Sequence, residues 1–248
     1  MTQALPQVSL GSSRLVRFLT DLSVSNTRVS HRQFTQRLGA LIDFSDSISL
    51  AEANARNIDV QDEDVVAFSE DITGEFLRGR SAIIQSAMRA FFPGSGPTRI
   101  KWPALEDSPP AGPTSAAQPY LKFYGAQQAE VDARIRGLHL RTREAMAPLS
   151  ARLARICAID AALSDALGQH SRRYLASVPR LLSQRLELLY EEHRQGVEQG
   201  MDAGAHWQET RERYRRECQG LLLAEIEARL LPTLGLIESL NEETTDED

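Results

Sequence analysis

Cysteine, lysine and long apolar runs are all scarce in this chain of 248 residues. Two cysteines are too few for a disulfide scaffold, and they indicate a reducing compartment such as the cytoplasm. Lysine occurs only at positions 101 and 122, so arginine supplies 26 of the 28 basic residues. We attribute this excess to GC-rich coding rather than to a binding role for arginine.

No stretch of the sequence is apolar enough for a signal peptide or a membrane-spanning helix. Near the N-terminus, the short apolar groups are broken by Asp21 and Asn26. The most apolar late stretch, residues 221–240, contains four charged side chains and Pro232, whereas a bilayer requires about 20 consecutive apolar residues. We therefore expect a cytoplasmic protein, with a peripheral role at a membrane complex left open.

The short motifs of the common enzyme classes are also missing. A phosphate-binding loop requires a lysine directly after a glycine, and neither lysine occupies that position. No histidine follows an acidic residue at the spacing of a helical di-iron site, and no serine stands in a Gly-x-Ser-x-Gly turn. We predict no catalytic residue, no metal site and no cofactor. The five histidines are interpreted as surface or packing residues, and Cys157 and Cys218 as buried, unreactive thiols.

The negative charge is concentrated at the C-terminal end. The formal net charge of −6 equals the charge of residues 238–248, which contain six acidic residues and no base. The body is therefore formally neutral and offers no long-range attraction for nucleic acid. Between positions 209 and 217, four arginines are interleaved with three glutamates, which favours a salt-bridged exposed face over a nucleic-acid contact. We interpret residues 241–248 as a disordered acidic tail rather than a partner-binding arm.

Proline marks the main boundary in the chain. Seven of the 11 prolines fall between positions 93 and 119, and proline removes a backbone donor and fixes φ. We therefore predict an extended linker over residues 93–119 that contains no helix. It separates an N-terminal helical lobe, residues 1–92, from a C-terminal helical bundle, residues 120–240. Within the linker, Trp102 and Ile100 either pin the chain onto a lobe or face a partner.

Both predicted lobes show apolar residues at helical spacing, and no alternating pattern indicates a strand. In the first lobe, helices are expected to begin at these capping residues: Ser12 or Ser13, Ser30, Ser45 or Asp46, and Asp62. Gly74 and Gly79 can split the last of them. In the second lobe, we expect Pro148 and Gly168 to end helices and Ser150 to begin one. We expect Pro179 to kink or restart a helix and Pro232 to stop or bend the last helix. These lengths predict an all-α protein whose second half is a bundle of long antiparallel helices.

One carboxylate falls on a predicted core face. Asp160 lies in the apolar seam formed by Leu153, Ile156, Leu163 and Leu167. A buried carboxylate needs a charged or hydrogen-bonding partner, so we predict that an arginine pairs with Asp160 and fixes the helix register. A catalytic acid is the alternative interpretation of the same residue.

Several blocks of the sequence resemble a known protein family. The blocks are Phe34–Leu50, with Arg37-Leu38-Gly39 and Asp43-Phe44-Ser45-Asp46; Tyr120 and Tyr124 before Gln127; Leu175–Leu182 with Arg185; and Leu222–Leu240. In order, and over nearly the whole chain, they resemble a proteobacterial family called domain of unknown function 3348. The resemblance implies no catalytic or binding residue. It implies an accessory role beside a membrane assembly, because similar genes lie near envelope components that look like proton-channel stators and peptidoglycan binders.

We interpret the chain as a non-enzymatic adaptor or assembly protein that acts by protein–protein contact. A nucleic-acid-binding regulator and an enzyme without recognisable motifs are the alternatives. The late helices carry more apolar residues than one buried face requires, which indicates self-association or a helical protein partner, unless the N-terminal lobe covers the excess. No nucleic-acid or small-molecule partner is expected. The residues expected at the partner contact are Leu234, Leu236, Ile237 and Trp102.

Overall fold

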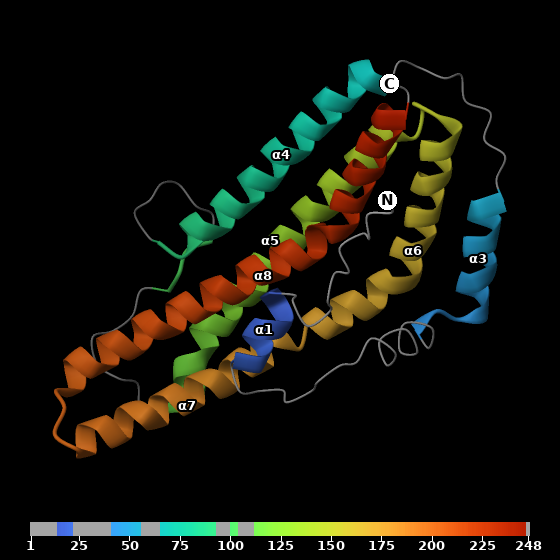
Figure 1. Cartoon of the computed structure of the whole chain (residues 1–248). Coiled ribbons are helices and arrows are strands. Elements are labelled where there is room, and N and C mark those ends of the chain that lie inside the picture. Colours follow the sequence, from blue (N-terminus) through green and yellow to red (C-terminus); the bar gives the residue numbers. More distant parts are fainter. Residues whose placement is uncertain (1–13, 22–40, 56–64, 93–99, 104–111, 247–248) are drawn as a thin grey trace, which may run out of the picture.

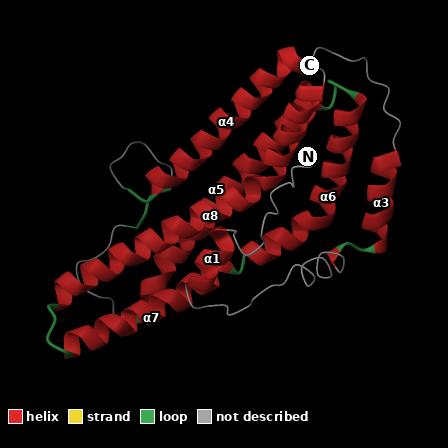
Figure 2. Ribbon diagram, in the orientation of Figure 1, coloured by secondary structure: helices red, strands yellow, loops and turns green. Residues whose placement is uncertain are grey.

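Every secondary-structure element in the described part of the chain is an α-helix, which confirms the predicted all-α class (Figure 1) (Figure 2). The structure is a computed structural model that describes residues 14–21, 41–55, 65–92, 100–103 and 112–246. Its helices are α1 (Arg14–Asp21), α3 (Phe44–Ala55), α4 (Val65–Ala90), α5 (Pro113–Met146), α6 (Ala151–Leu175), α7 (Val178–Glu198) and α8 (Ala203–Asp246). The helix expected to begin at Ser30, and the caps expected at Ser12, Ser13 and Asp62, lie outside the described residues.

The longest helix, α8, is the central element of the bundle. Its 44 residues span about 66 Å at 1.5 Å per residue. It packs against α1, α4, α5, α6 and α7. α4 runs antiparallel to α5 and α8, while α6 and α7 follow one another in the direction of α4 (Figure 1). α6 diverges from the other long helices, and α3 lies on its outer side (Figure 1).

Short sequence signals set the helix ends in the C-terminal half. α5 ends at Met146, just before Pro148. Ser150 begins α6, because its side chain accepts a hydrogen bond from the Leu153 N–H at 3.1 Å. Pro179 stands in the first turn of α7, where a backbone N–H has no helical partner to lose. The boundaries predicted at Pro148, Ser150 and Pro179 are therefore confirmed.

Two aspartates set the start of α3. Asp43 Oδ1 accepts a hydrogen bond from the Asp46 N–H at 2.8 Å, and Asp46 Oδ2 accepts one from the Asp43 N–H at 3.0 Å. This reciprocal capping box makes Phe44 the first helical residue. The predicted start at Ser45 or Asp46 is therefore one or two residues late.

Glycine and proline end fewer helices than the sequence predicts. α6 continues past Gly168 to Leu175, and α4 runs as one helix through Gly74 and Gly79. α8 continues past Pro232, with a change of direction in its last third (Figure 1). Glycine and proline disfavour a helix interior by about 1 and about 3 kcal/mol, and at Gly79 and Pro232 the burial of neighbouring apolar residues offsets such amounts. The predicted helix end at Gly168 is wrong.

The acidic end of the chain is helical as far as residue 246 and is docked at Glu243. Ser150 donates a hydrogen bond to Glu243 Oε1 at 2.7 Å, and Arg152 Nη1 lies 2.7 Å from Glu243 Oε2. Earlier in α8, Leu236 and Leu240 pack with residues of α5 and α6 in a small apolar cluster. The start of α6 thus supplies partners for the acidic end, and the prediction of a disordered tail is wrong for residues 241–246.

The proline-rich segment contains the beginning of a helix. α5 starts at Pro113 and includes Pro119. Pro113 stands in the first turn, where its fixed φ favours a helix and no N–H is needed, and Pro119 removes one hydrogen bond close to the helix start. The prediction that residues 93–119 contain no helix is therefore wrong for residues 113–119.

Trp102 anchors the segment between α4 and α5 to the core. It is 7% exposed, and the ring centres of Phe91, Tyr120 and Phe123 lie 5.3, 4.8 and 5.1 Å from its own. Its backbone N–H donates a hydrogen bond to the Ala90 carbonyl at 2.8 Å. Of the two interpretations of Trp102, the structure therefore supports the pinning of the chain.

One hydrophobic core contains residues from both sides of the proline-rich segment. Its members include Phe76 and Ile83 from α4, Phe91 directly after α4, Tyr124, Ile135 and Leu138 from α5, Leu182 and Leu189 from α7, and Tyr214, Leu222 and Ile237 from α8. α4 approaches α5 so closely that a Cβ at Gly79 would lie 2.7 Å from Leu138 Cδ1. The division into two separate lobes is therefore not confirmed.

Candidate functional site

The core of the bundle holds a buried carboxylate. Glu225 of α8 has no exposed surface, and Tyr124 of α5 donates a hydrogen bond to its Oε1 at 2.7 Å. Gln128 Nε2 lies 3.0 and 2.9 Å from the two carboxylate oxygens. Arg229 Nη2 is 3.2 Å from Glu225 Oε2, and Arg229 Nη1 is 2.9 Å from Asp132 Oδ1. Both oxygens of Glu225 are thus satisfied by neighbours within the protein.

This cluster also holds the bend between α6 and α7. Gln128 Nε2 donates to the Leu175 carbonyl at 3.1 Å, so it links the last residue of α6 to α5 and α8. Burial raises the pKa of Glu225, although its hydrogen bonds and Arg229 oppose the shift. Burial also raises the pKa of Tyr124 well above its usual value, which keeps its hydroxyl a donor. The cluster sets the register of three helices and has no open side for a substrate.

Asp160 has the arginine partner that the sequence predicts. Arg143 Nη1 lies 3.3 Å from Asp160 Oδ2, and His139 Nε2 lies 2.7 Å from the same oxygen. On its other side, His139 Nδ1 is 2.9 Å from Thr233 Oγ1. These contacts follow the order acid, base and hydroxyl of a hydrolytic triad, but Thr233 has no exposed surface that a substrate could reach. The series connects α5, α6 and α8.

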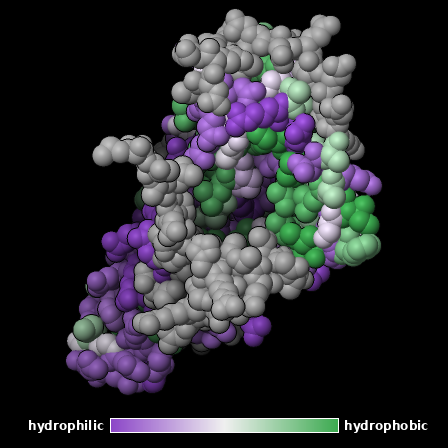
Figure 3. All heavy atoms as spheres, turned by 45° about the vertical axis from the view of Figure 1, so that its right-hand side comes forward, coloured by the Kyte–Doolittle hydropathy of each residue, from purple (hydrophilic) through white to green (hydrophobic). Residues whose placement is uncertain are grey.

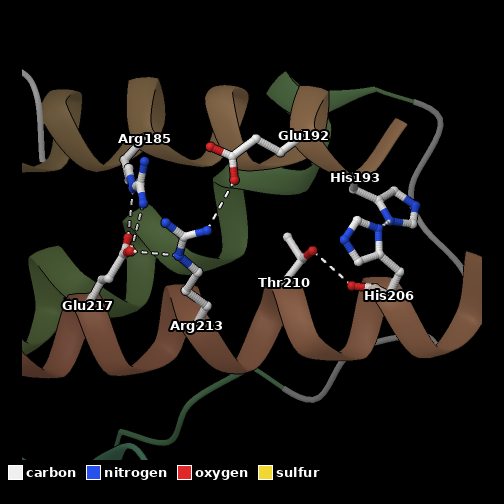
Figure 4. A network of polar contacts seen from close by, with 7 residues as sticks. All are labelled: Arg185, Glu192, His193, His206, Thr210, Arg213 and Glu217. Atoms are coloured by element: carbon white, nitrogen blue, oxygen red, sulfur yellow. Dashed lines mark hydrogen bonds and ion pairs between the residues drawn. The ribbon is translucent and has the colours of Figure 1, made fainter. Parts of the chain in front are cut away.

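A ladder of charged side chains joins α7 to α8 (Figure 4). Arg185 donates two hydrogen bonds of 2.8 Å to the two oxygens of Glu217. Arg213 lies 3.2 Å from Glu217 and 3.1 Å from Glu192, so it continues the ladder toward solvent. The hydrogen bonds to Glu217 raise the pKa of Arg185. A paired fork of this kind fixes the alignment of two helices and leaves no charge free for chemistry.

Two histidines face each other where this ladder ends (Figure 4). His193 Nδ1 of α7 lies 3.2 Å from His206 Nδ1 of α8. The ring centres of Trp207 and Tyr190 lie 5.3 and 6.4 Å from that of His193, which is buried. Burial, and then the neighbouring His206, lowers the pKa of His193 below its usual value, so the neutral ring is favoured. The burial of His193 fits its interpretation as a packing residue.

Both cysteines are buried and form no disulfide. Burial raises the pKa of the Cys157 thiol to about 11 and the pKa of the Cys218 thiol still further above its usual range. The thiolate is the reactive form of cysteine, and a raised pKa removes it at neutral pH. The prediction of buried thiols is confirmed.

α3 presents an apolar face that no other described helix covers. Phe44 is 82% exposed and Ile48 is 44% exposed, and Ala51 and Ala55 continue the same stripe. On the opposite side, Ala53 is buried, and α6 is the main neighbour of α3 among the described helices. Hydrophobic side chains gather on the side of the molecule where α3 and α6 lie, beside a hollow in the surface (Figure 3). We call Phe44, Ile48, Ala51 and Ala55 the outer face of α3.

The four residues predicted at a partner contact do not share a surface. Leu236, Ile237 and Trp102 are 2%, 4% and 7% exposed and belong to the core of their own chain. Leu234 is 39% exposed, one turn after the 61% exposed Leu231. The helices that pack around α8 therefore bury Leu236 and Ile237 and leave Leu231 and Leu234 exposed.

Two further findings concern membranes and metals. Within the ranges that the structure describes, no helix has both the length and the apolar character needed to cross a bilayer. The same residues contain no group of three or more His, Cys, Asp or Glu side chains placed to hold a metal ion.

A comparison with protein families identifies the chain. The family described as protein of unknown function (DUF3348) has a model that matches residues 1–242. The chain belongs to the DUF3348 family. This finding confirms the resemblance carried by the sequence blocks from Phe34 to Leu240. No curated protein and no solved structure matches this DUF3348 protein.

The Glu225 cluster of this DUF3348 protein is not among the sites predicted from its sequence. In the sequence, Glu225 stands within an apolar run, where a charged residue is easily taken for one that faces solvent. Its register is the signal that reveals it, because Glu225 follows the core residues Cys218 and Leu221 by seven and four positions and so shares their face. Tyr124 and Gln128 are related by the same four-residue step on α5.

Proposed function

We propose that this DUF3348 protein is a non-enzymatic adaptor that binds a protein partner through the outer face of α3. The observation that carries this proposal is the 82% exposure of Phe44 together with the 44% exposure of Ile48 on one helical stripe. Aromatic side chains that are exposed in one chain and buried on association dominate binding energies at interfaces. The charged side chains of the clusters described above, in contrast, are paired with partners inside the same cluster.

Charge on α3 indicates the chemistry of the partner. Residues 43–55 contain Asp43, Asp46 and Glu52 and no base. Asp43 and Glu52 are exposed beside the outer face. A complementary surface therefore combines an apolar groove with Arg or Lys at its rim.

A second copy of the chain is a poor occupant for this face. Pairing α3 with α3 of another copy would oppose two identical acidic flanks, and like charges across an interface cost affinity. We therefore assign the outer face to a different, basic protein. Self-association through the exposed Leu231 and Leu234 of α8 stays a separate prediction.

The setting of the interaction also stays a proposal. The family resemblance implies a partner in an envelope assembly, and we propose that the chain contacts such an assembly from its cytoplasmic side. A nucleic-acid partner fits the outer face poorly, because the phosphate backbone would meet the acidic flank of α3.

The test combines two substitutions on the outer face. Phe44→Glu with Ile48→Glu places two charges at the centre of the proposed contact, and both sites are exposed, so helix content stays unchanged. The partner is captured by crosslinking in the native cell, purified and titrated against the full chain. We expect the double variant to lower affinity by at least about thirtyfold, which corresponds to a hot-spot loss of 2 kcal/mol.

A matched control uses another exposed apolar pair. Phe68 and Leu77 of α4 are 47% and 51% exposed, and Phe68→Glu with Leu77→Glu introduces the same charge elsewhere on the surface. This control should bind like the unaltered chain, and added salt should weaken the unaltered complex. Equal binding by both double variants would refute the assignment of α3.

A further inference from the structure

Three potential metal ligands meet around Gly196 at the tip of the α7–α8 hairpin. A Cβ at Gly196 would lie 2.8 Å from His206 Nδ1 and 3.1 Å from Met201 Sδ. His193 Nδ1 lies 3.2 Å from His206 Nδ1. His206 therefore has the Met201 sulfur on the side of Gly196 and, within 3.2 Å of its Nδ1, the Nδ1 of His193.

The two rings have the spacing of ligands on one ion. Two nitrogens that each lie about 2.0 Å from a tetrahedral metal are roughly 3.3 Å apart, and their ring centres are about 5 Å apart. The observed values are 3.2 Å between the Nδ1 atoms and 5.2 Å between the ring centres. A hydrogen bond between the rings accounts for the first distance, but it gives no role to the sulfur beside them.

The backbone of the turn directs Met201 toward the histidines. Gly200 has a φ of +93°, a conformation that favours glycine. The Met201 N–H donates a hydrogen bond to the Gly196 carbonyl at 3.1 Å, so the turn is closed upon itself. Met201 remains 53% exposed, which leaves the sulfur accessible to an incoming ion.

We propose that His193, His206 and Met201 form a binding site for a soft monovalent ion, Cu(I) or Ag(I). Thioether sulfur favours Cu(I), imidazole suits copper as well as zinc, and hard cations prefer carboxylates. The aromatic rings of Tyr190 and Trp207 surround His193 and provide the apolar shell that suits a singly charged ion. The bound ion links residue 193 of α7 to residue 206 of α8 and closes the hairpin.

The site differs from the usual protein metal centres in one respect. It has two histidines and a methionine in place of three His, Cys, Asp or Glu side chains. Zn(II) and Ni(II) gain little from a thioether, so they lose one of the three ligands. The proposal is therefore selective, because removal of the sulfur should affect the soft ion alone.

The experiment titrates the full chain with silver nitrate in a buffer free of chloride and thiols. Calorimetry should give one Ag(I) per chain, and the fluorescence of Trp207 should fall as the ion binds next to its ring. We expect His206→Gln to abolish this binding and the exposed-site variant Met201→Leu to weaken it at least about tenfold. Met201→Leu should leave the weaker binding of Zn(II) unchanged.

Two controls separate this site from other soft ligands. Met88 is an exposed methionine on α4, and Met88→Leu should bind Ag(I) like the unaltered chain. Cys157→Ala with Cys218→Ala removes the buried thiols and should retain the binding. Undiminished Ag(I) binding by Met201→Leu, or loss of binding with the two thiols, would overturn the proposal even if His206→Gln fails to fold.

Discussion

Replacement of Gly79 by alanine tests the contact between α4 and α5. The new Cβ would lie 2.7 Å from Leu138 Cδ1 and 3.1 Å from Leu138 Cδ2. Leu138 is 1% exposed and belongs to the main core, so it has little room to move. Overpacking of a core costs about 1–3 kcal/mol, and alanine in place of glycine in a helix interior gains about 1 kcal/mol. We expect a net loss of up to about 2 kcal/mol in the free energy of unfolding.

Gly74 in the same helix provides the matched control. The nearest atoms to a Cβ at Gly74 belong to the guanidinium of Arg78, at 3.2 Å and beyond, and this flexible side-chain end can move aside. Gly74→Ala should therefore stabilise the chain by up to about 1 kcal/mol. Two identical changes in one helix thus have opposite expected signs.

Urea unfolding followed by circular dichroism measures both variants. Shortening the neighbour with Leu138→Ala removes the two δ carbons, and in that background Gly79→Ala should become stabilising. The difference between the two backgrounds is the coupling energy, for which we expect about 1–3 kcal/mol. If Gly79→Ala stabilises the unaltered chain as much as Gly74→Ala does, α4 does not pack on α5, and two independent lobes would be the better description.

Two predictions concern the buried Glu225. Tyr124→Phe removes one hydrogen-bond donor from a carboxylate with no exposed surface, so the free energy of unfolding should fall by about 1–3 kcal/mol. Urea titration measures this change, and an unchanged unfolding midpoint would contradict the hydrogen bond. The second prediction is pH dependence. Because burial raises the pKa of Glu225 above its usual 4.5, the folded chain retains this proton where the unfolded chain has lost it. The stabilisation is complete below about pH 4.5 and is lost as the pH rises through the raised pKa. Relative to Glu225→Gln, which does not titrate, the unaltered chain should lose stability over the interval that begins at about pH 4.5 and extends up to the raised pKa, by at most about 1.4 kcal/mol per pH unit. A relative stability that rises over this interval would show that the pKa is lowered instead.

The helices and many of their ends follow from local sequence signals. Ser150 and the prolines at 148 and 179 act through hydrogen bonds and φ restrictions within a few residues, so their effects are predictable without a structure. Asp160 was also predictable, because a carboxylate in an apolar seam requires a partner. Its second partner, His139, lies on α5 one turn before Arg143, and the spacing within α6 indicates the position of neither partner.

The remaining errors arise where tertiary contacts override local preference. Gly168 weakens a helix locally, but α6 packs on α3 and continues to the buried Leu175. Of the two outcomes predicted for Pro232, α8 shows no stop, because Leu230, Thr233 and Leu236 on either side of it are buried. Glu243 has only acidic residues as charged neighbours in the sequence, and it is the folded structure that brings Arg152 within ion-pair distance of it. The outer face of α3 was missed for the same reason, since a short apolar helix looks like core until its packing is known.

The position of α8 at the centre of the bundle has a consequence for synthesis of the chain. This helix contacts α1, α4, α5, α6 and α7, yet it occupies the last fifth of the sequence and leaves the ribosome last. Until then, the earlier helices have only one another to pack against, so the part of their apolar surface that α8 covers is exposed to aggregation or to chaperones. A premature stop before residue 203 therefore removes the common partner of α1, α4, α5, α6 and α7, and the truncated fragment cannot complete the main core.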